Sequence, residues 1–205
     1  MSPSPRRQQP SPEHRIAFFQ AFLRKPKEVG SIIPSSRFLM RRVVRQARVD
    51  RARLVVELGP GTGGSTRALL RSMRPDATLL AIEINPRFAR LIAASVRDPR
   101  LIVHVGSAED ITGALKAHGL PAPDVVLSGI PFSTMSQGLG LAIVREVNHV
   151  LAPGGRFVAY QVRDRVEMLG RQVFGPAHIQ TELLNVPPMR VYRWDKPAGS
   201  AFAGA

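Results

Sequence analysis

Short apolar runs alternate with amphipathic stretches from residue 53 onward, and this pattern predicts strands alternating with helices. The runs predict five strands, at residues 53–58, 78–84, 100–106, 124–132 and 154–162. Helical spacing is found at residues 66–73, 87–97 and 138–151, with a shorter helix expected between the third and fourth strands. Two further runs, 179–186 and 190–194, predict a terminal hairpin-like pair of strands. Repeated β-α-β order predicts an α/β fold with a parallel, doubly wound sheet.

Two helices are expected before the first strand. In residues 14–26, apolar side chains recur at helical spacing beside basic ones, and Pro26 ends the segment. The second helix is predicted to begin at Ser35 or Ser36 as its N-cap and to run through residues 37–49. Residues 1–12 are rich in Pro, Ser and Arg and are expected to form a disordered leader. The predicted organisation is a leader at 1–12, a helical segment at 13–50, one α/β domain at 51–196 and a flexible tail at 197–205.

Charge adds a constraint on the partner. The net charge of the 205 residues is +14, and residues 1–53 hold thirteen Lys and Arg against three acidic residues. This asymmetry favours a polyanionic partner, and nucleic acid or anionic lipid would both fit. An Arg-rich composition inherited from a GC-rich genome is the alternative. Because the chain has no cysteine and its five histidines show no ligand-like spacing, we expect no metal site. The chain has no apolar run of about twenty residues and no apolar signal segment, so a cytoplasmic protein is expected.

The glycines after the first predicted strand suggest a ligand. Residues 55–66, VVELGPGTGGST, place Gly59, Gly61 and Gly64 at the spacing G-x-G-x-x-G. A dinucleotide would set its pyrophosphate against the N–H groups of this turn, but Glu57 would repel that anion and Pro60 lacks an N–H. S-adenosylmethionine has no phosphate and brings an ammonium and a sulfonium cation. The turn therefore favours S-adenosylmethionine over NAD.

A second acid stands at the end of the second predicted strand. Glu83 lies 24 residues beyond Gly59, where a carboxylate can accept hydrogen bonds from both hydroxyls of a ribose. This placement serves either cofactor, so it supports a nucleoside ligand without choosing between them.

The strings ELGPGTG, AIEINP, GSAED and SGIPF, each after a predicted strand, together resemble the class I S-adenosylmethionine-dependent methyltransferases. The resemblance implies a Rossmann-like fold with a mostly parallel seven-stranded sheet and helices on both faces. It implies that Ser107 and Ala108 meet the amino edge of adenine and that Ile84 packs on its face, although many relatives carry Asp in place of Ser107. The segment VGSIIPSS resembles one that closes over the cofactor, with Ser31 near its methionine end. The expected cofactor residues are Ser31, Glu57, Gly59, Gly61, Gly63, Glu83, Ile84, Ser107, Ala108 and Ser128.

The loop SGIPF, residues 128–132, bears on the acceptor. Methyl transfer requires an oriented, uncharged nucleophile and the exclusion of water. In relatives that methylate adenine N6 or dimethylate ribosomal RNA, the loop begins with Asn or Asp, whose oxygen holds the exocyclic amine. Ser128 replaces that residue, while the Pro-Phe pair that follows stays compatible. A ribosomal RNA adenine-N6 methyltransferase is therefore the alternative, and a nucleic acid partner is not favoured.

The strings FLRKPKEVGSIIPSS, ELGPGTG, SGIPF and NVPPMRVYRW, spread over residues 18–194, resemble the short bacterial phospholipid N-methyltransferases. The resemblance implies methylation of phosphatidylethanolamine to mono- and dimethylated products and to phosphatidylcholine. It also implies an N-terminal amphipathic helix on anionic membrane, which places the protein at the inner face of the cell membrane. The helix residues are Phe18, Phe19, Phe22, Arg24 and Lys25. Its residue pattern alone favours a helix packed in the core over a membrane helix.

Several residues are candidates for contact with a lipid amine. Tyr160, late in the fifth strand, could accept a hydrogen bond from the amine or offer its ring face to the methylated ammonium. Tyr192 is a second candidate, and for both the alternative is a buried structural tyrosine. The expected catalytic residues are Tyr160, Ser128 and Phe132. Arg163, Arg165 and Arg190 are expected to hold the lipid phosphate, with a solvated face as the alternative. A third class of function is a membrane-binding protein that keeps the cofactor fold without catalysis.

Overall fold

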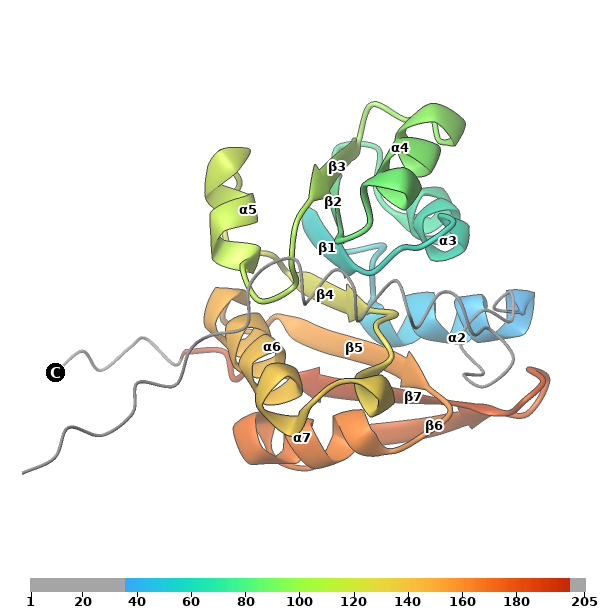
Figure 1. Cartoon of the computed structure of the whole chain (residues 1–205), viewed down its shortest axis with the longest axis vertical. Helices are drawn as coiled ribbons and strands as arrows, with labels where there is room; N and C mark the ends of the chain where they lie inside the picture. Colours follow the sequence, from blue (N-terminus) through green and yellow to red (C-terminus); the bar gives the residue numbers. More distant parts are fainter. Residues whose placement is uncertain (1–35, 200–205) are drawn as a thin grey trace, which may run out of the picture.

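Seven strands form one sheet in the computed structural model, which describes residues 36–199 (Figure 1). They are β1 Leu54–Leu58, β2 Thr78–Glu83, β3 Leu101–Val105, β4 Val125–Ser128, β5 Arg156–Gln161, β6 His178–Glu182 and β7 Met189–Asp195. Their order across the sheet is β3-β2-β1-β4-β5-β7-β6. The first five pair in parallel, whereas β7 pairs antiparallel with both β5 and β6. The predicted α/β fold with a mostly parallel seven-stranded sheet is confirmed.

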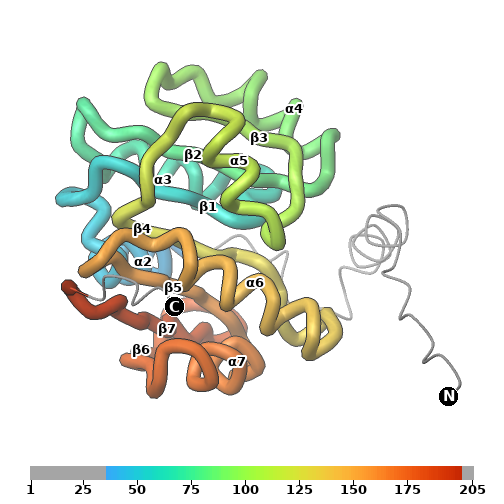
Figure 2. Tube along the Cα trace, turned by 90° about the vertical axis from the view of Figure 1, so that its left-hand side faces the viewer, coloured from blue at the N-terminus to red at the C-terminus, as the bar shows by residue number. Residues whose placement is uncertain are grey.

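Helices cover both faces of this sheet. They are α2 Arg37–Ala47, α3 Gly64–Ser72, α4 Pro86–Ser95, α5 Ile111–Ala117, α6 Gln137–Val150 and α7 Arg165–Phe174, with a 3₁₀ turn at Phe132–Thr134. One core cluster joins α2 and α3 to the sheet, and the other joins α5, α6 and α7 to the opposite face. In Figure 2, β2 and β3 lie with α4 at one end of the molecule, and β6, β7 and α7 lie at the other. Within residues 36–199, no helix is long and apolar enough to cross a bilayer.

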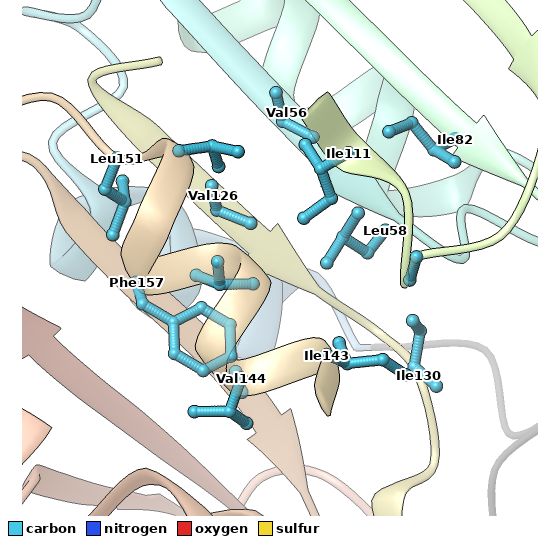
Figure 3. Packing of buried hydrophobic residues seen from close by; sticks show 14 of the residues in the cluster. Val56, Leu58, Ile82, Ile111, Val126, Ile130, Ile143, Val144, Leu151 and Phe157 are labelled. Atoms are coloured by element: carbon cyan, nitrogen blue, oxygen red, sulfur yellow. The ribbon is translucent and has the colours of Figure 1, made fainter. Parts of the chain in front are cut away.

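The strand β1 shows why its sequence is a continuous apolar run. All five of its residues are buried, because the sheet is covered on both faces. Val55 belongs to the cluster of α2 and α3, while Val56 and Leu58 belong to the cluster of α5, α6 and α7. Figure 3 shows Val56 and Leu58 in the latter cluster together with Ile143 of α6. Burial on two faces therefore replaces the alternation of apolar and polar residues seen in half-exposed strands.

Local capping signals place two of the predicted helices. The Ser36 hydroxyl accepts a hydrogen bond from Leu39 N at 3.1 Å and starts α2, which confirms the second predicted helix. Asn85 caps α4 in the same way and Pro86 occupies its first turn, at the start of the helix predicted at residues 87–97. The first predicted helix, in residues 14–26, lies outside the described residues.

The helix α7 was not among the elements that the sequence predicted. Gly170 lies within it, and a glycine inside a helix lowers its intrinsic stability by about 1 kcal/mol relative to alanine. In the fold, a Cβ on Gly170 would lie 2.3 Å from Cζ2 of Trp194, so the indole packs directly on the helix backbone. Tertiary packing against β7 therefore accounts for a glycine that works against local propensity.

The chain beyond α7 forms the predicted terminal pair of strands, but the first of them ends at Glu182, so residues 183–186 of the predicted strand belong to the turn. In β7, Arg190 pairs with Gln161 at the end of β5 on one side and with Thr181 of β6 on the other. Because β7 is antiparallel to β5, its first residues lie beside the carboxyl end of β5. The turn at residues 183–188 therefore extends beyond the sheet at the edge where the parallel strands end, as Figure 1 shows.

Candidate active site

A glycine loop follows β1 at the carboxyl edge of the sheet. Leu58, the last residue of β1, pairs with Ile82 of β2 on one side and with Ser128 of β4 on the other. The loop is tied to β2 because Gly59 N donates to the Ile82 carbonyl at 3.0 Å. Gly59, Gly61 and Gly63 have φ angles of +69°, +57° and +82°, in the left-handed region that favours glycine. The three glycines predicted to contact the cofactor thus form one sharp turn.

Glu83 holds this turn against the next strand. Its Oε2 accepts from Gly61 N at 3.0 Å, and its Oε1 accepts from Asn85 N at 2.9 Å. The residue is only 1% exposed, and burial raises the pKa of its carboxyl. Each oxygen keeps a second lone pair that can accept from a hydroxyl. The structure therefore gives Glu83 a role in shaping the loop that the sequence did not indicate.

Glu57 lies one position before the end of β1, beneath the first turn of α3. Its Oε2 accepts from the Thr66 hydroxyl at 2.7 Å, and its Oε1 has no hydrogen-bond partner among residues 36–199. Burial raises the pKa of Glu57 to about 7, against the opposing effect of the Ser65 and Thr66 hydroxyls. A buried carboxylate with an unpaired oxygen is stabilised by a nearby cation. This chemistry fits the ammonium and sulfonium of S-adenosylmethionine.

The residues expected around adenine follow β2 and β3, which are neighbours. Gly106 N donates to the Glu83 carbonyl at 3.1 Å and joins the ends of the two strands. Ile84 is half-buried after β2, and Ala108 is buried after β3. The Ser107 hydroxyl accepts from Glu109 N at 3.2 Å. The structure brings these residues to one edge of the sheet, and their contact with adenine stays a prediction.

The acceptor loop after β4 is held tightly. Ser128 is fully buried, and its hydroxyl accepts from Ile130 N at 3.2 Å. The carbonyl of Ile130 accepts from Gln161 Nε2 at the end of β5. Phe132 has no exposed surface and belongs to the core cluster beneath the loop. The structure thus places Phe132 as a support of the loop, and its predicted contact with the acceptor stays a prediction.

Tyr160 meets both loops at the end of β5. A Cβ on Gly129 would lie 2.8 Å from the Tyr160 hydroxyl oxygen and 3.3 Å from the Gly59 carbonyl oxygen. The missing side chain of Gly129 therefore allows the tyrosine hydroxyl to approach the point where the cofactor loop meets the acceptor loop. The side chain of Tyr160 is partly buried. Its position agrees with the predicted contact with an amine, which stays a prediction.

Tyr192, the second tyrosine candidate, is a core residue. It is fully buried in the cluster of α5, α6 and α7, and its ring stacks on Trp194 with centroids 6.1 Å apart. Tyr160 packs on the cluster at the other face of the sheet. The two tyrosines therefore lie on opposite faces, and the structure favours the alternative of a buried structural tyrosine for Tyr192.

The three arginines predicted to hold phosphate lie near the end of β5. Arg163 follows β5 and is exposed, Arg165 is the first residue of α7, and Arg190 pairs with Gln161 across the strands and is exposed. Their backbone positions bring them to the edge of the sheet that carries the acceptor loop. Binding of a phosphate by these residues stays a prediction. The other predicted contacts, Ser31 and the helix residues Phe18, Phe19, Phe22, Arg24 and Lys25, lie outside the described residues.

Four residues of the site were not identified as such from the sequence. Thr66 and Asn85 bond to the two glutamates, Gly129 admits the Tyr160 hydroxyl, and Gln161 anchors the acceptor loop. The only sequence signal for them is that they lie in or next to segments already expected at the carboxyl edge. Their roles depend on contacts between distant parts of the chain.

Comparison with known proteins identifies the family. A family model described as a methyltransferase domain matches residues 55–155. The chain is also 32% identical over 177 residues to a protein named ornithine lipid N-methyltransferase from Singulisphaera acidiphila, covering 85% of this chain and 92% of that protein. The chain belongs to the class I S-adenosylmethionine-dependent methyltransferases. Within residues 36–199 of this methyltransferase, no three His, Asp or Glu side chains gather as a metal site requires.

One further relative is similar in sequence, and a solved structure is similar in fold. The methyltransferase is 39% identical over 99 residues to the ribosomal RNA small subunit methyltransferase A of Caulobacter vibrioides, covering 47% of this chain and 36% of that protein. Its fold is similar to that of the N-methyltransferase NodS from Bradyrhizobium japonicum bound to S-adenosylhomocysteine. The TM-score is 0.63 at 14% identity, covering 88% of this chain and 98% of that one. S-adenosylmethionine is the methyl donor of this methyltransferase, as the glycine loop and Glu57 predicted.

Proposed function

We propose that this methyltransferase N-methylates the amine of a membrane lipid, phosphatidylethanolamine, to its mono- and dimethylated derivatives and to phosphatidylcholine. The observation that carries the proposal is the similarity to a relative named as a lipid N-methyltransferase over 92% of that relative's length. Because that name specifies ornithine lipid, ornithine lipid is the second candidate acceptor, with the same chemistry at an amine.

The arrangement at the carboxyl edge suits an amine acceptor. Bound S-adenosylmethionine supplies a methyl group activated by its sulfonium. The amine must be neutral to attack the methyl group. A side chain that accepts a hydrogen bond from the amine N–H can orient the nitrogen lone pair toward the methyl group and so speed the reaction. We assign this contact to the hydroxyl of Tyr160, with Ser128 beside it at the end of β4 and Phe132 supporting the loop from the core. Arg163, Arg165 and Arg190 would hold the lipid phosphate.

The ribosomal RNA alternative has its own supporting observation. Several relatives named as ribosomal RNA small subunit methyltransferase A match the chain, one of them at 39% identity. However, the match at 39% spans only 36% of that protein, and Ser128 stands where those enzymes carry Asn or Asp by the resemblance noted above. A lipid acceptor is therefore favoured over a nucleobase.

Radiolabelled S-adenosylmethionine tests the acceptor directly. With vesicles that contain phosphatidylethanolamine and an anionic lipid, we expect label in methylated lipids separated by thin-layer chromatography. Parallel reactions contain ornithine lipid or ribosomal RNA, and the cofactor-site variant Glu83→Ala serves as the inactive control. Label in ornithine lipid alone would correct the substrate, and label in RNA with none in either lipid would reject the proposal.

The variant Tyr160→Phe tests the assigned contact. Loss of one hydrogen bond of about 1.4 kcal/mol in the transition state should lower kcat about tenfold. Affinity for S-adenosylhomocysteine should stay unchanged, because the ring remains in place. Initial rates over a range of lipid concentrations measure the effect. Tyr192→Phe is the comparison variant, since it removes a tyrosine hydroxyl on the other face of the sheet, where it donates to the Arg163 carbonyl at 3.5 Å. Equal rates for Tyr160→Phe and wild type would remove the hydroxyl from the mechanism.

A further inference from the structure

The turn between β6 and β7 exposes three aliphatic side chains. Leu183, Leu184 and Val186 are 72%, 64% and 81% exposed. Adjacent exposed apolar residues of this kind mark an interaction surface more often than single ones do. The turn lies beyond the carboxyl edge of the sheet, the edge that also carries the acceptor loop (Figure 1).

Polar contacts beneath the turn fix its shape. Leu184 N donates to Glu182 Oε1 at 3.0 Å, and the Asn185 side chain donates to the Pro187 carbonyl at 2.9 Å. Asn185 also accepts from Ser36 N at 3.0 Å, which ties the turn to the start of α2. Asn185 is buried and its side chain bonds to both Ser36 and Pro187, whereas the aliphatic side chains of the turn are exposed.

The helix α2 places a row of arginines beside this turn. Phe38, Arg41, Arg42 and Arg45 of α2 line an open hollow of about 430 Å³ together with Glu182 and Leu184. Glu182 is the acidic residue of this lining. It forms an ion pair with Arg42 at 2.9 Å, which lowers the pKa of Glu182. With Glu182 engaged by Arg42, the exposed guanidinium groups of Arg41 and Arg45 leave the hollow positively charged.

We propose that this surface, which we call the α2–turn surface, docks on an anionic lipid membrane. It comprises Leu183, Leu184, Val186, Phe38, Arg37, Arg41, Arg45 and Arg190. The aliphatic side chains enter the boundary between headgroups and acyl chains, and the arginines contact the lipid phosphates. Docking there would turn the acceptor loop toward the headgroups. The inference rests on the proposed lipid acceptor and adds a membrane contact outside the predicted N-terminal helix.

Charge and polarity together favour lipid over RNA at this surface. Arginines alone would suit the phosphates of either partner. RNA recognition adds aromatic side chains that stack on bases, but the most exposed apolar side chains here, Leu183, Leu184 and Val186, are aliphatic. The aromatic residue of the surface, Phe38, is 36% exposed, and the Arg37 guanidinium lies over its ring at 5.0 Å. A lipid interface can do both, because it takes up aliphatic side chains at the boundary of the acyl chains and binds arginine side chains at the adjacent headgroup phosphates.

Flotation of the full chain with vesicles tests the surface. Wild type should bind vesicles that contain phosphatidylglycerol and should bind weakly to vesicles of phosphatidylcholine alone. The variants Leu183→Ser/Leu184→Ser and Arg41→Glu/Arg45→Glu should each lower the partition coefficient on anionic vesicles at least about tenfold. The matched controls lie on or next to α4 at the other end of the sheet: Leu91→Ser, with an exposed leucine, and Arg90→Glu/Arg97→Glu. These controls should bind as wild type does.

Three results of the flotation and melting experiments would overturn the proposal. The first is unchanged flotation of both variants, and the second is a loss of flotation in the control variants as large as in the test variants. The third is a leucine variant that melts at a lower temperature in the absence of vesicles but floats as wild type does. The last would mean that the turn packs against another part of the chain. Loss of RNA binding in the arginine variant, with flotation intact, would assign the surface to RNA and would also reject the proposal.

Activity in detergent separates this inference from the proposed function. The leucine variant should methylate phosphatidylethanolamine dispersed in mixed micelles at the wild-type rate, because the acceptor then needs no docking. If wild type methylates no lipid in micelles yet both variants lose flotation, the proposed function fails and the docking surface stands. If micellar lipid is methylated and flotation is unaffected by the substitutions, the docking surface fails and the function stands.

Discussion

Glu83→Ala is expected to weaken the binding of S-adenosylhomocysteine about 100-fold. The carboxylate accepts from Gly61 N and Asn85 N, and we expect its remaining lone pairs to accept from the ribose hydroxyls. Hydrogen bonds to a charged group contribute about 1.5 kcal/mol or more each, so two of them correspond to about 3 kcal/mol of binding free energy. Isothermal titration calorimetry measures the dissociation constant.

Two further variants control for that result. Glu83→Gln keeps one carbonyl oxygen, so its affinity should fall between those of wild type and the alanine variant. Glu167→Ala removes an acid that pairs with Arg171 on the surface of α7 and should bind as wild type does. If Glu83→Ala is folded and binds S-adenosylhomocysteine within threefold of wild type, Glu83 does not contact the cofactor.

Glu57→Gln is expected to remove a pH dependence from the stability of the ligand-free protein. Its pKa is raised from 4.5 to about 7, chiefly by burial, so the folded state holds this proton over a pH range where the unfolded chain releases it. The free energy of unfolding therefore falls as pH rises from about 4.5 to about 7, by up to about 3 kcal/mol from this group. In urea denaturation, the free energy of unfolding of the variant should therefore fall less than that of wild type as pH rises from about 5 to about 8.

Cofactor binding by the wild type should depend on pH in the opposite direction. A cationic sulfonium favours the ionised form of Glu57, so S-adenosylmethionine should gain affinity relative to S-adenosylhomocysteine as pH rises through about 7. In Glu57→Gln this ratio should stay flat. Asp50→Asn, at an exposed acid, is the matched control for loss of one negative charge. The same pH dependence in wild type and Glu57→Gln would show that Glu57 does not titrate in this range.

The cofactor half of the site could be predicted because its signals are local. Gly59, Gly61 and Gly63 adopt backbone angles that other residues avoid. Asn85 followed by Pro86 is typical of a helix start, here directly after Glu83. These constraints act within a few residues of the chain. The turn with Glu57 favoured S-adenosylmethionine over NAD, the likeness to methyltransferase motifs agreed with it, and the structural and sequence relatives support it.

The acceptor half depends on contacts between segments far apart in the sequence. The sequence offered Tyr160 and Tyr192 as equivalent candidates, but the pairing of Ala159 with Tyr192 puts the two rings on opposite faces of the sheet. Likewise, the turn at residues 183–188 meets α2 through the bond from Ser36 to Asn185, 149 residues apart. No local pattern encodes either relation.

The sequence by itself determined the strands, the order of most helices, the glycine turn and the two buried acids, because burial patterns and backbone angles are set by neighbouring residues. Only the tertiary structure decided that α7 forms around Gly170 under Trp194, that Phe132 belongs to the core and that arginines of α2 border an apolar turn. These features arise from packing between elements, since a residue's face and neighbours are fixed only when the sheet is assembled.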